Sequence, residues 1–212
     1  MGKNVIISGG SRGLGKALSG RIYEMGYGVS TFSRTMVDSQ VEEDGKKYIT
    51  TRADIRYEND IVRVLDRTKS IAGGADILIL SAGVAARKQD ILRSSVITMR
   101  KVYETNVFAN FNLMSEAIRY FGLKMVVFIT SDVSFNNYPG WGVYGSSKAA
   151  LDYIIKQASM ETVSPVFLSI NPGDMDTEMH SEADPESDAS DLISADEGAR
   201  RVISAIMQEM EI

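Results

Sequence analysis

Tyr144 and Lys148 are a pair whose residue types and spacing can perform proton chemistry. They stand four positions apart in Tyr-Gly-Ser-Ser-Lys, and residues four apart on a helix share one face. An ammonium beside a phenol favours the phenolate and lowers the tyrosine pKa from its usual value of about 10. Such a tyrosine can donate a proton to a carbonyl oxygen or remove one from an alcohol.

The same spacing occurs again in Tyr120-Phe-Gly-Leu-Lys124, so spacing alone does not identify a site. The second copy contains Gly122 and straddles a helix end and a strand start, so its side chains need not share a face. Ser131 favours the first copy, because it ends the apolar run 125–130 at the edge where parallel sheets place ligands. Its hydroxyl can hydrogen-bond a substrate oxygen as charge develops there. A serine that merely closes a strand is the alternative.

A glycine-rich turn follows the first apolar run, with glycines at positions 9, 10, 13 and 15. Glycines allow a tight turn and let backbone N–H groups and a helix N-terminus approach a pyrophosphate. Gly10 to Lys16 also fits the P-loop pattern, but Ala17 stands where that loop needs Ser or Thr for Mg²⁺. The turn therefore favours a dinucleotide over a nucleoside triphosphate, and a turn that binds nothing is the remaining alternative.

The segments that must position these residues alternate between short apolar runs, which are typical of strands, and stretches with apolar residues three or four positions apart, which are typical of helices. Six short runs rich in β-branched residues predict strands at 5–7, 28–32, 47–53, 75–80, 125–130 and 166–170. Amphipathic stretches between them predict helices at about 14–25, 61–71, 95–121, 144–160 and 195–210. Ser194 and Glu197 predict a capping box at the start of the last helix. The alternation predicts an α/β fold over residues 1–212: a single-domain, Rossmann-type, doubly wound parallel sheet of six strands flanked by helices.

Composition excludes several classes of site and partner. The 212 residues include no cysteine and a single histidine, which rules out thiol nucleophiles, disulfides and a Cys- or His-rich site, so we expect no metal. Twenty-three Lys plus Arg against 28 Asp plus Glu give a net charge of −5, which argues against a nucleic-acid partner. No run reaches the roughly 18 apolar residues of a membrane span, and the start does not resemble a signal peptide. A cytoplasmic protein without a membrane partner is expected.

The spacing Gly9-x-x-x-Gly13-x-Gly15, together with Ser131 thirteen residues before Tyr144, resembles the short-chain dehydrogenase/reductase family. Five motifs in order carry the resemblance, over about residues 4–178. It implies an oxidoreductase that passes hydride between a nicotinamide cofactor and a carbonyl or alcohol. The implied catalytic residues are Asn106, Ser131, Tyr144 and Lys148. The asparagine would support a water that connects the lysine to solvent, and a surface asparagine is the alternative.

The resemblance also implies which residues hold the cofactor. Besides Tyr144 and Lys148, these residues lie in the glycine-rich turn and directly after the second, third, fourth and sixth predicted strands. They are Gly9, Ser11, Arg12, Gly13, Leu14, Gly15, Ser33, Arg34, Asp54, Ile55, Ala82, Gly83, Pro172, Gly173 and Thr177. Asp54 matches the acidic residue that meets the adenine ring, and Thr177 the residue that contacts the cofactor near the nicotinamide. Ser81-Ala82-Gly83 departs from the family's Asn-Asn-Ala-Gly, which changes how that loop is held together.

The end of the second strand distinguishes the two nicotinamide dinucleotides. NAD-binding folds place a carboxylate there for the ribose 2′-hydroxyl, but this sequence continues with Ser33-Arg34. Arg34 and Arg12 can pair with a 2′-phosphate, because a planar guanidinium suits phosphate. NADP(H) is therefore preferred, with NAD(H) left open, and the expected reaction is reduction of an aldehyde or ketone with Tyr144 as general acid/base. The alternative is that either arginine is a solvated surface charge.

The substrate side is less specified by the sequence. Phe135, Tyr138 and Trp141 can line an apolar pocket for a small-molecule carbonyl or alcohol, or can belong to the core or an interface. Between Asp174 and Glu197 there are ten carboxylates and no Lys or Arg. This charge run predicts a solvated loop and, compatibly, an acidic substrate lid over residues 174–194.

The end of the chain bears on assembly. The sequence stops at Ile212 without the seventh strand that closes typical family members and often joins their subunits. A homodimer through the helices at 95–121 and 144–160 is therefore expected rather than a tetramer. A catalytically silent NADP(H)-binding sensor or protein-interaction module is the alternative function, and the complete set of four catalytic residues argues against it.

Overall fold

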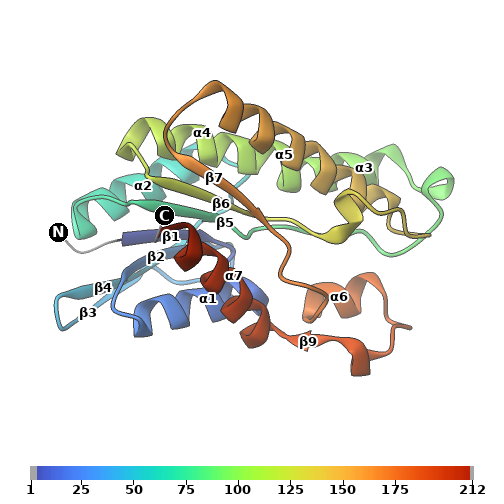
Figure 1. The fold of residues 1–212 in the computed structure, drawn as a ribbon, viewed down its shortest axis with the longest axis horizontal. Helices are drawn as coiled ribbons and strands as arrows, with labels where there is room; N and C mark the ends of the chain where they lie inside the picture. The colour runs from blue at the N-terminus through green and yellow to red at the C-terminus, as the bar shows by residue number, and fades with distance from the viewer. Residues whose placement is uncertain (1–3, 211–212) are drawn as a thin grey trace.

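The computed structural model describes residues 4–210 and arranges them as a sheet between two layers of helices (Figure 1). The sheet has the strand order β3-β4-β2-β1-β5-β6-β7. All neighbouring strands are parallel except β3 and β4, which form an antiparallel hairpin. The strands are β1 (Asn4–Ser8), β2 (Gly28–Ser33), β3 (Ser39–Glu43), β4 (Lys46–Arg52), β5 (Ile77–Leu80), β6 (Met125–Ile129) and β7 (Val166–Ile170). The predicted α/β, doubly wound fold is confirmed.

The sheet has seven strands, one more than the six predicted. All five residues of β3 are exposed, so this edge strand has no buried face and no hydrophobic pattern to reveal it. Its turn to β4 is Asp44-Gly45, with φ values of 51° and 75°, and positive φ at both positions is the geometry of a tight hairpin. A second, two-stranded sheet pairs β8 (Met175–Asp176) with β9 (Ile193–Ser194) and was also unsignalled by the sequence.

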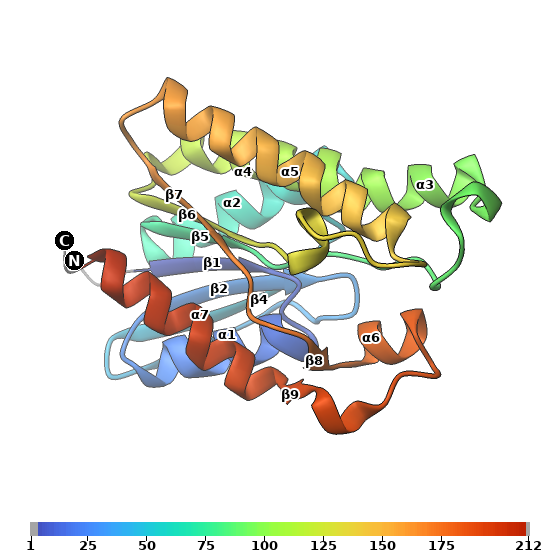
Figure 2. The same ribbon diagram turned by 45° about the vertical axis from the view of Figure 1, so that its right-hand side comes forward.

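Helices cover both faces of the sheet (Figure 2). One face carries α1 (Gly13–Glu24) and α7 (Ala195–Met210), and the other carries α2 (Glu58–Ala72), α4 (Asn110–Phe121) and α5 (Gly142–Glu161). The predicted helix at 95–121 is α3 (Val96–Tyr103) and α4 joined by a π-helical turn, η2 (Glu104–Ala109). A short helix, α6 (Glu178–Ala183), lies beside the small sheet at the carboxyl end of the strands. Single 3₁₀ turns are η1 (Ile91–Arg93), η3 (Asp132–Ser134) and η4 (Ala189–Asp191).

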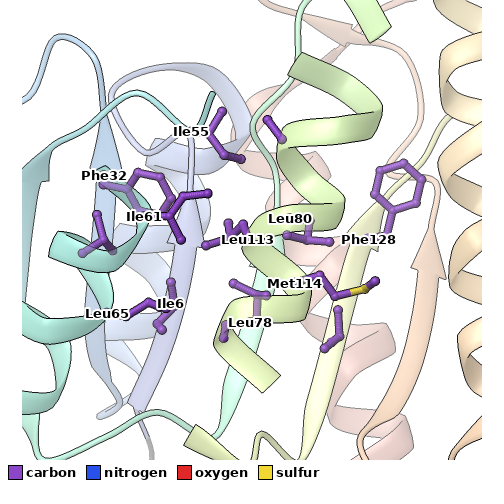
Figure 3. Packing of buried hydrophobic residues seen from close by; sticks show 14 of the residues in the cluster. Ile6, Phe32, Ile55, Ile61, Leu65, Leu78, Leu80, Leu113, Met114 and Phe128 are labelled. Carbon is purple, nitrogen blue, oxygen red and sulfur yellow. The ribbon is translucent and has the colours of Figure 1, made fainter. Parts of the chain in front are cut away.

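Two buried apolar clusters hold the strands in place, one on each face of the sheet. Toward α2 and α4, the first includes Ile6, Phe32, Ile61, Leu65, Leu78, Leu80, Leu113, Met114 and Phe128 (Figure 3). Toward α1 and α7, the second includes Ile7, Leu14, Leu18, Val29, Ile79, Val127, Val202 and Ile206. Successive residues of a strand point to opposite faces, and here both faces are covered. The strands therefore have continuous apolar runs, and their carboxyl ends are rigidly placed.

The last helix begins as the sequence predicts. Glu197 donates its backbone N–H to Ser194 Oγ at 3.1 Å, which is one of the two bonds of a capping box. Among residues 4–210, none of the helices combines the length and the apolar character needed to cross a membrane. The last two positions, 211–212, on which the expectation about a further strand rests, lie outside the described residues.

Candidate active site

The carboxyl ends of the parallel strands open into a cavity of about 1120 Å³. Every residue predicted to hold the cofactor lines this cavity, although the residues come from six different parts of the chain. Ser131, Tyr144 and Lys148 line it as well. Asn106 is buried behind its wall, where a Cβ on Gly83 would lie 3.4 Å from Asn106 Oδ1 and 3.8 Å from Lys148 Nζ. The structure therefore brings the four predicted catalytic residues to one end of the predicted cofactor site.

The glycine-rich turn and the start of α1 form one wall of the cavity. A Cβ on Gly15 would lie 2.3 Å from the carbonyl oxygen of Gly9, and one on Gly9 would lie 3.0 Å from Ala82 Cα. Only glycine fits at these close backbone approaches. Arg12 makes no side-chain cap, and the first turn of α1 holds no acidic residue. Uncapped N–H groups at a helix N-terminus suit an anion, so the residues present fit the pyrophosphate of a dinucleotide.

Lys148 lies beside Tyr144 on the buried face of α5. Its Nζ lies 5.5 Å from the centre of the Tyr144 ring and donates a hydrogen bond to the carbonyl oxygen of Ile129 at 2.8 Å. The side chain is buried, and burial lowers the pKa of Lys148 to about 8 although Asp152 opposes the shift. The side chain is therefore still mostly the ammonium at neutral pH and loses its proton as the pH rises through about 8.

The pKa of the Tyr144 hydroxyl differs from the sequence-based expectation. Burial raises this pKa above its usual range, and the carboxylates of Asp174 and Asp132 raise it further. The direction is opposite to the one expected from Lys148, because desolvation of the phenolate outweighs the attraction of the neighbouring ammonium. Tyr144 is therefore a phenol at neutral pH and can donate a proton.

Asn106 interrupts the long helix at the π-helical turn η2. Its Oδ1 accepts a hydrogen bond from Val84 N at 2.8 Å, while its Nδ2 donates to Val84 O and to Ser147 Oγ, both at 2.9 Å. The alternative of a surface asparagine does not hold, because the side chain is buried and all of these bonds are internal. Asn106 ties the loop after β5 to α5, the helix that carries Tyr144.

The loop after β5 is held without the family's two leading asparagines. Ser8 Oγ accepts hydrogen bonds from the backbone N–H groups of Ser81 at 3.1 Å and Ala82 at 3.0 Å. Asn110 Nδ2 donates to the carbonyl oxygen of Ala82 at 3.0 Å. Residues on β1 and α4 thus supply the bonds that this loop needs.

The second Tyr-x-x-x-Lys copy forms no site. Tyr120 OH donates to Asp66, whereas Lys124 Nζ pairs with Asp76 at 2.8 Å. Between them Gly122 has φ 60° and ends α4 in the left-handed conformation. The two side chains therefore bond to separate carboxylates and do not form a pair, as the break at the glycine predicts.

On the substrate side the structure brings two of the three predicted aromatic residues to the cavity. Tyr138 and Trp141 line it, and the Trp141 ring centre lies 6.0 Å from those of Tyr144 and His180. Phe135, in contrast, does not line the cavity and is 70% exposed, so of its three alternatives neither the pocket nor the core applies. It follows the 3₁₀ turn η3, where its N–H bonds back to Asp132 O at 3.1 Å and the chain turns outward.

Five further residues line the same cavity: Lys88, Asp132, Asp174, His180 and Asp184. The last three belong to the predicted lid at 174–194 without being singled out, whereas sequence reasoning missed Lys88 and Asp132. Asp132 follows Ser131 directly, and Asp174 follows the Pro172-Gly173 segment, so their adjacency to motifs was the available signal. Lys88 and Asp184 form an ion pair at 2.7 Å across 96 positions of sequence, and no local pattern predicts such a pair.

The two arginines expected near the ribose differ in their contacts. Arg34 lines the cavity at the end of β2, and residues 4–210 contain no ion pair to it. Arg12 pairs with Glu178 and, at 3.4 Å, with Glu182, both on α6. Asp54 is also partnered: Arg56 lies 2.6 Å away and holds the pKa of this carboxyl below its usual range.

A doubly wound sheet with a phosphate-binding turn after β1 and a Ser-Tyr-Lys group at its carboxyl edge defines a dinucleotide-dependent oxidoreductase. Comparison with known proteins agrees. The family profile described as short chain dehydrogenase matches residues 3–188, and the chain belongs to this family. It is an oxidoreductase acting between carbonyl and alcohol groups.

Two similar proteins are benzil reductases that form (S)-benzoin. The one from Bacillus subtilis is 32% identical over 183 residues, which cover 82% of this chain and 75% of the relative. The one from Saccharomyces cerevisiae is 26% identical over 194 residues, covering 84% of this chain and 74% of the relative. Among solved structures, the KRED1-Pglu enzyme superposes with a TM-score of 0.78 at 27% identity, covering 98% of this chain and 88% of the other.

Proposed function

We propose that this chain reduces an aldehyde or ketone to an alcohol with NADPH, and that Tyr144 is the general acid. The observation that carries the proposal is that Tyr144, Lys148 and Ser131 line the same cavity as the glycine-rich turn. Burial keeps Tyr144 protonated, and reduction of a carbonyl needs a proton donor at the oxygen.

The cofactor would be held by the glycine-rich turn, the loops after β2, β4 and β5, and the Pro172–Thr177 segment. When bound, NADPH supplies a hydride to the carbonyl carbon. Tyr144 donates its proton to the carbonyl oxygen, and Lys148, buried beside it, supplies positive charge that stabilises the phenolate left behind. Asn106 holds the loop after β5 against α5, the helix that carries Tyr144, by hydrogen bonds to both.

NADPH is proposed over NADH because Arg34 lines the cavity at the end of β2, in a place where NAD-binding folds carry a carboxylate. For the substrate we propose an aldehyde or ketone with an aromatic group, since Tyr138 and Trp141 line the cavity and two relatives are benzil reductases. The test is NADPH consumption with benzil and a panel of aryl aldehydes and ketones. Consumption with none of them, despite NADPH binding, would instead support the silent sensor.

Residues 174–194 are proposed to form an acidic lid over the substrate. Residues of α6 line the cavity, and an ion pair lies at each end of this helix: Arg12 with Glu178 at its start, and Lys88 with Asp184 directly after its last residue. Lys88 N–H also donates to the carbonyl oxygen of Ala183 at 2.8 Å. These bonds fasten the lid to both walls, so that a substrate beneath it would be shielded from water.

Lid carboxylates and a cofactor phosphate compete for Arg12 in this arrangement. We therefore expect the double substitution Glu178→Gln and Glu182→Gln to raise the affinity for NADPH about two- to fivefold, the usual size for exposed ion pairs. Isothermal titration calorimetry measures this directly. Glu186→Gln is the matched control, because Glu186 is exposed in the same loop and does not contact Arg12. Unchanged affinity in the double variant would show that Arg12 does not meet the phosphate.

We also propose a homodimer through α3, η2, α4 and α5. Large apolar side chains are exposed along these helices: Ile97, Phe108, Phe111 and Tyr153. Contiguous exposed apolar surface on several neighbouring helices is typical of a protein interface.

Placing charge on that surface should separate the subunits. The double substitution Phe108→Asp and Phe111→Asp is expected to convert the dimer into a monomer without loss of helical circular dichroism, because both side chains are exposed in the single chain. Size-exclusion chromatography with light scattering gives the masses. Val37→Asp, also at an exposed apolar residue but in the loop after β2, should leave the dimer intact. A wild-type monomer or tetramer would contradict the proposal.

A further inference from the structure

Asp132 connects two hydroxyl groups that line the substrate end of the cavity. Its Oδ1 accepts a hydrogen bond from Ser131 Oγ at 3.2 Å, and its Oδ2 accepts one from the Tyr138 hydroxyl at 2.7 Å. Asp132 itself lines the cavity and begins the 3₁₀ turn η3. One carboxylate therefore orients both the serine of the catalytic group and an aromatic residue of the substrate wall.

The chemistry of these groups sets the direction of each proton. A carboxylate oxygen has lone pairs and no proton, whereas a serine hydroxyl has one proton and two lone pairs. Ser131 therefore donates its hydroxyl proton to Asp132, and only the lone pairs of its Oγ are left for a substrate. Tyr144 keeps its proton, because burial and the two nearby carboxylates raise its pKa. The cavity thus offers a substrate oxygen one donor, Tyr144, and one acceptor, Ser131.

This pair of groups matches an alcohol better than a carbonyl. An alcohol oxygen can accept the proton of Tyr144 while its own proton is donated to Ser131 Oγ. A carbonyl oxygen can only accept, so it bonds to Tyr144 and faces the lone pairs of Ser131. Ser131 can donate its proton to a carbonyl oxygen only after its hydrogen bond to Asp132 has been broken.

Building on the proposed function, we propose that Asp132 is a positioning residue that holds Ser131 as a hydrogen-bond acceptor, so that the site binds the product alcohol more tightly than the carbonyl substrate. Asp132 acts through Ser131 and does not touch the substrate oxygen itself. Product release is then opposed by the hydrogen bond that the alcohol donates to Ser131 Oγ, which the bond from Ser131 to Asp132 makes possible.

The test compares two complexes in which no reaction occurs. Benzil is titrated into the protein with NADP⁺, and hydrobenzoin into the protein with NADPH, by isothermal titration calorimetry. Removal of the acceptor by Asp132→Ala frees the Ser131 proton. Benzil should then bind about three- to tenfold more tightly and hydrobenzoin about three- to tenfold more weakly, the range of one hydrogen bond. Asp132→Asn retains one acceptor oxygen, so it should shift both affinities in the same directions by less.

Two controls separate this effect from a general change of the cavity. In a Ser131→Ala background, Asp132→Ala still releases the Tyr138 hydroxyl, but it should leave the ratio of the two affinities unchanged, because the group that discriminates alcohol from carbonyl is gone. Asp66→Ala, at an exposed aspartate on α2 that does not line the cavity, should leave the ratio of the two affinities unchanged. An unchanged ratio in Asp132→Ala, or a shift of both ligands in one direction, would overturn this inference and leave the proposed function standing. Failure of both ligands to bind the wild-type complexes would overturn the proposed substrate class and the inference with it.

Discussion

Tyr144→Phe is expected to lower kcat for carbonyl reduction about 10³-fold and to leave the dissociation constant for NADPH within twofold. Phenylalanine removes only the hydroxyl, so the ring still fills its place beside Trp141 and over Lys148. The loss corresponds to a general acid, whose contribution is about 10²–10⁴-fold. Single-turnover measurement of NADPH oxidation with benzil gives the rate, and a fluorescence titration gives the affinity.

Tyr120→Phe is the matched control for this variant, because Tyr120 belongs to the second Tyr-x-x-x-Lys copy and bonds to Asp66 away from the cavity. It should retain wild-type kcat. If Tyr144→Phe keeps more than a tenth of the wild-type rate, another group donates the proton. A wild-type protein that binds NADPH tightly and reduces no member of the carbonyl panel would support the silent binding module instead.

Arg34→Asp should reverse the cofactor preference and lower the affinity for NADPH about 10²-fold. A charge-assisted hydrogen bond to phosphate is lost, and a carboxylate is placed where the 2′-phosphate would lie. The same carboxylate can accept hydrogen bonds from the ribose hydroxyl of NADH. The affinity for NADH should therefore stay the same or rise. Titrations with both cofactors, followed by the fluorescence of Trp141, measure the ratio.

Arg52→Asp makes the same charge change in a neighbouring position. Arg52 pairs in register with Ser33 on the adjacent strand, is exposed and does not line the cavity. It should change the affinity for NADPH by less than threefold. Tighter binding of NADH than NADPH by the wild-type protein would disprove the assignment of Arg34 and leave the reductase itself unaffected.

Local sequence was sufficient for the framework of this site. The glycine-rich turn, the strand that ends at Ser131 and the helix that carries Tyr144 and Lys148 each follow from residue type and spacing within about 15 positions. The spacing of apolar residues predicts such helices and strands, because the faces that are buried against the rest of the protein must be apolar. The edge strand β3 has no buried residue, so the same reasoning gives it no signal.

The tertiary structure decided how these groups are charged and to what they bond. The pKa of Tyr144 rises because the fold buries the phenol near Asp132 and Asp174, although its sequence neighbour Lys148 predicts the opposite. Arg12 meets Glu178 across 166 positions of sequence, and Phe135 turns outward while Trp141 turns inward. Burial and long-range contact depend on where every other segment packs, whereas periodicity depends on a single segment. The sequence by itself therefore determined the fold and the groups that we propose to react, and packing decided their protonation, their partners and which side chains face the cavity.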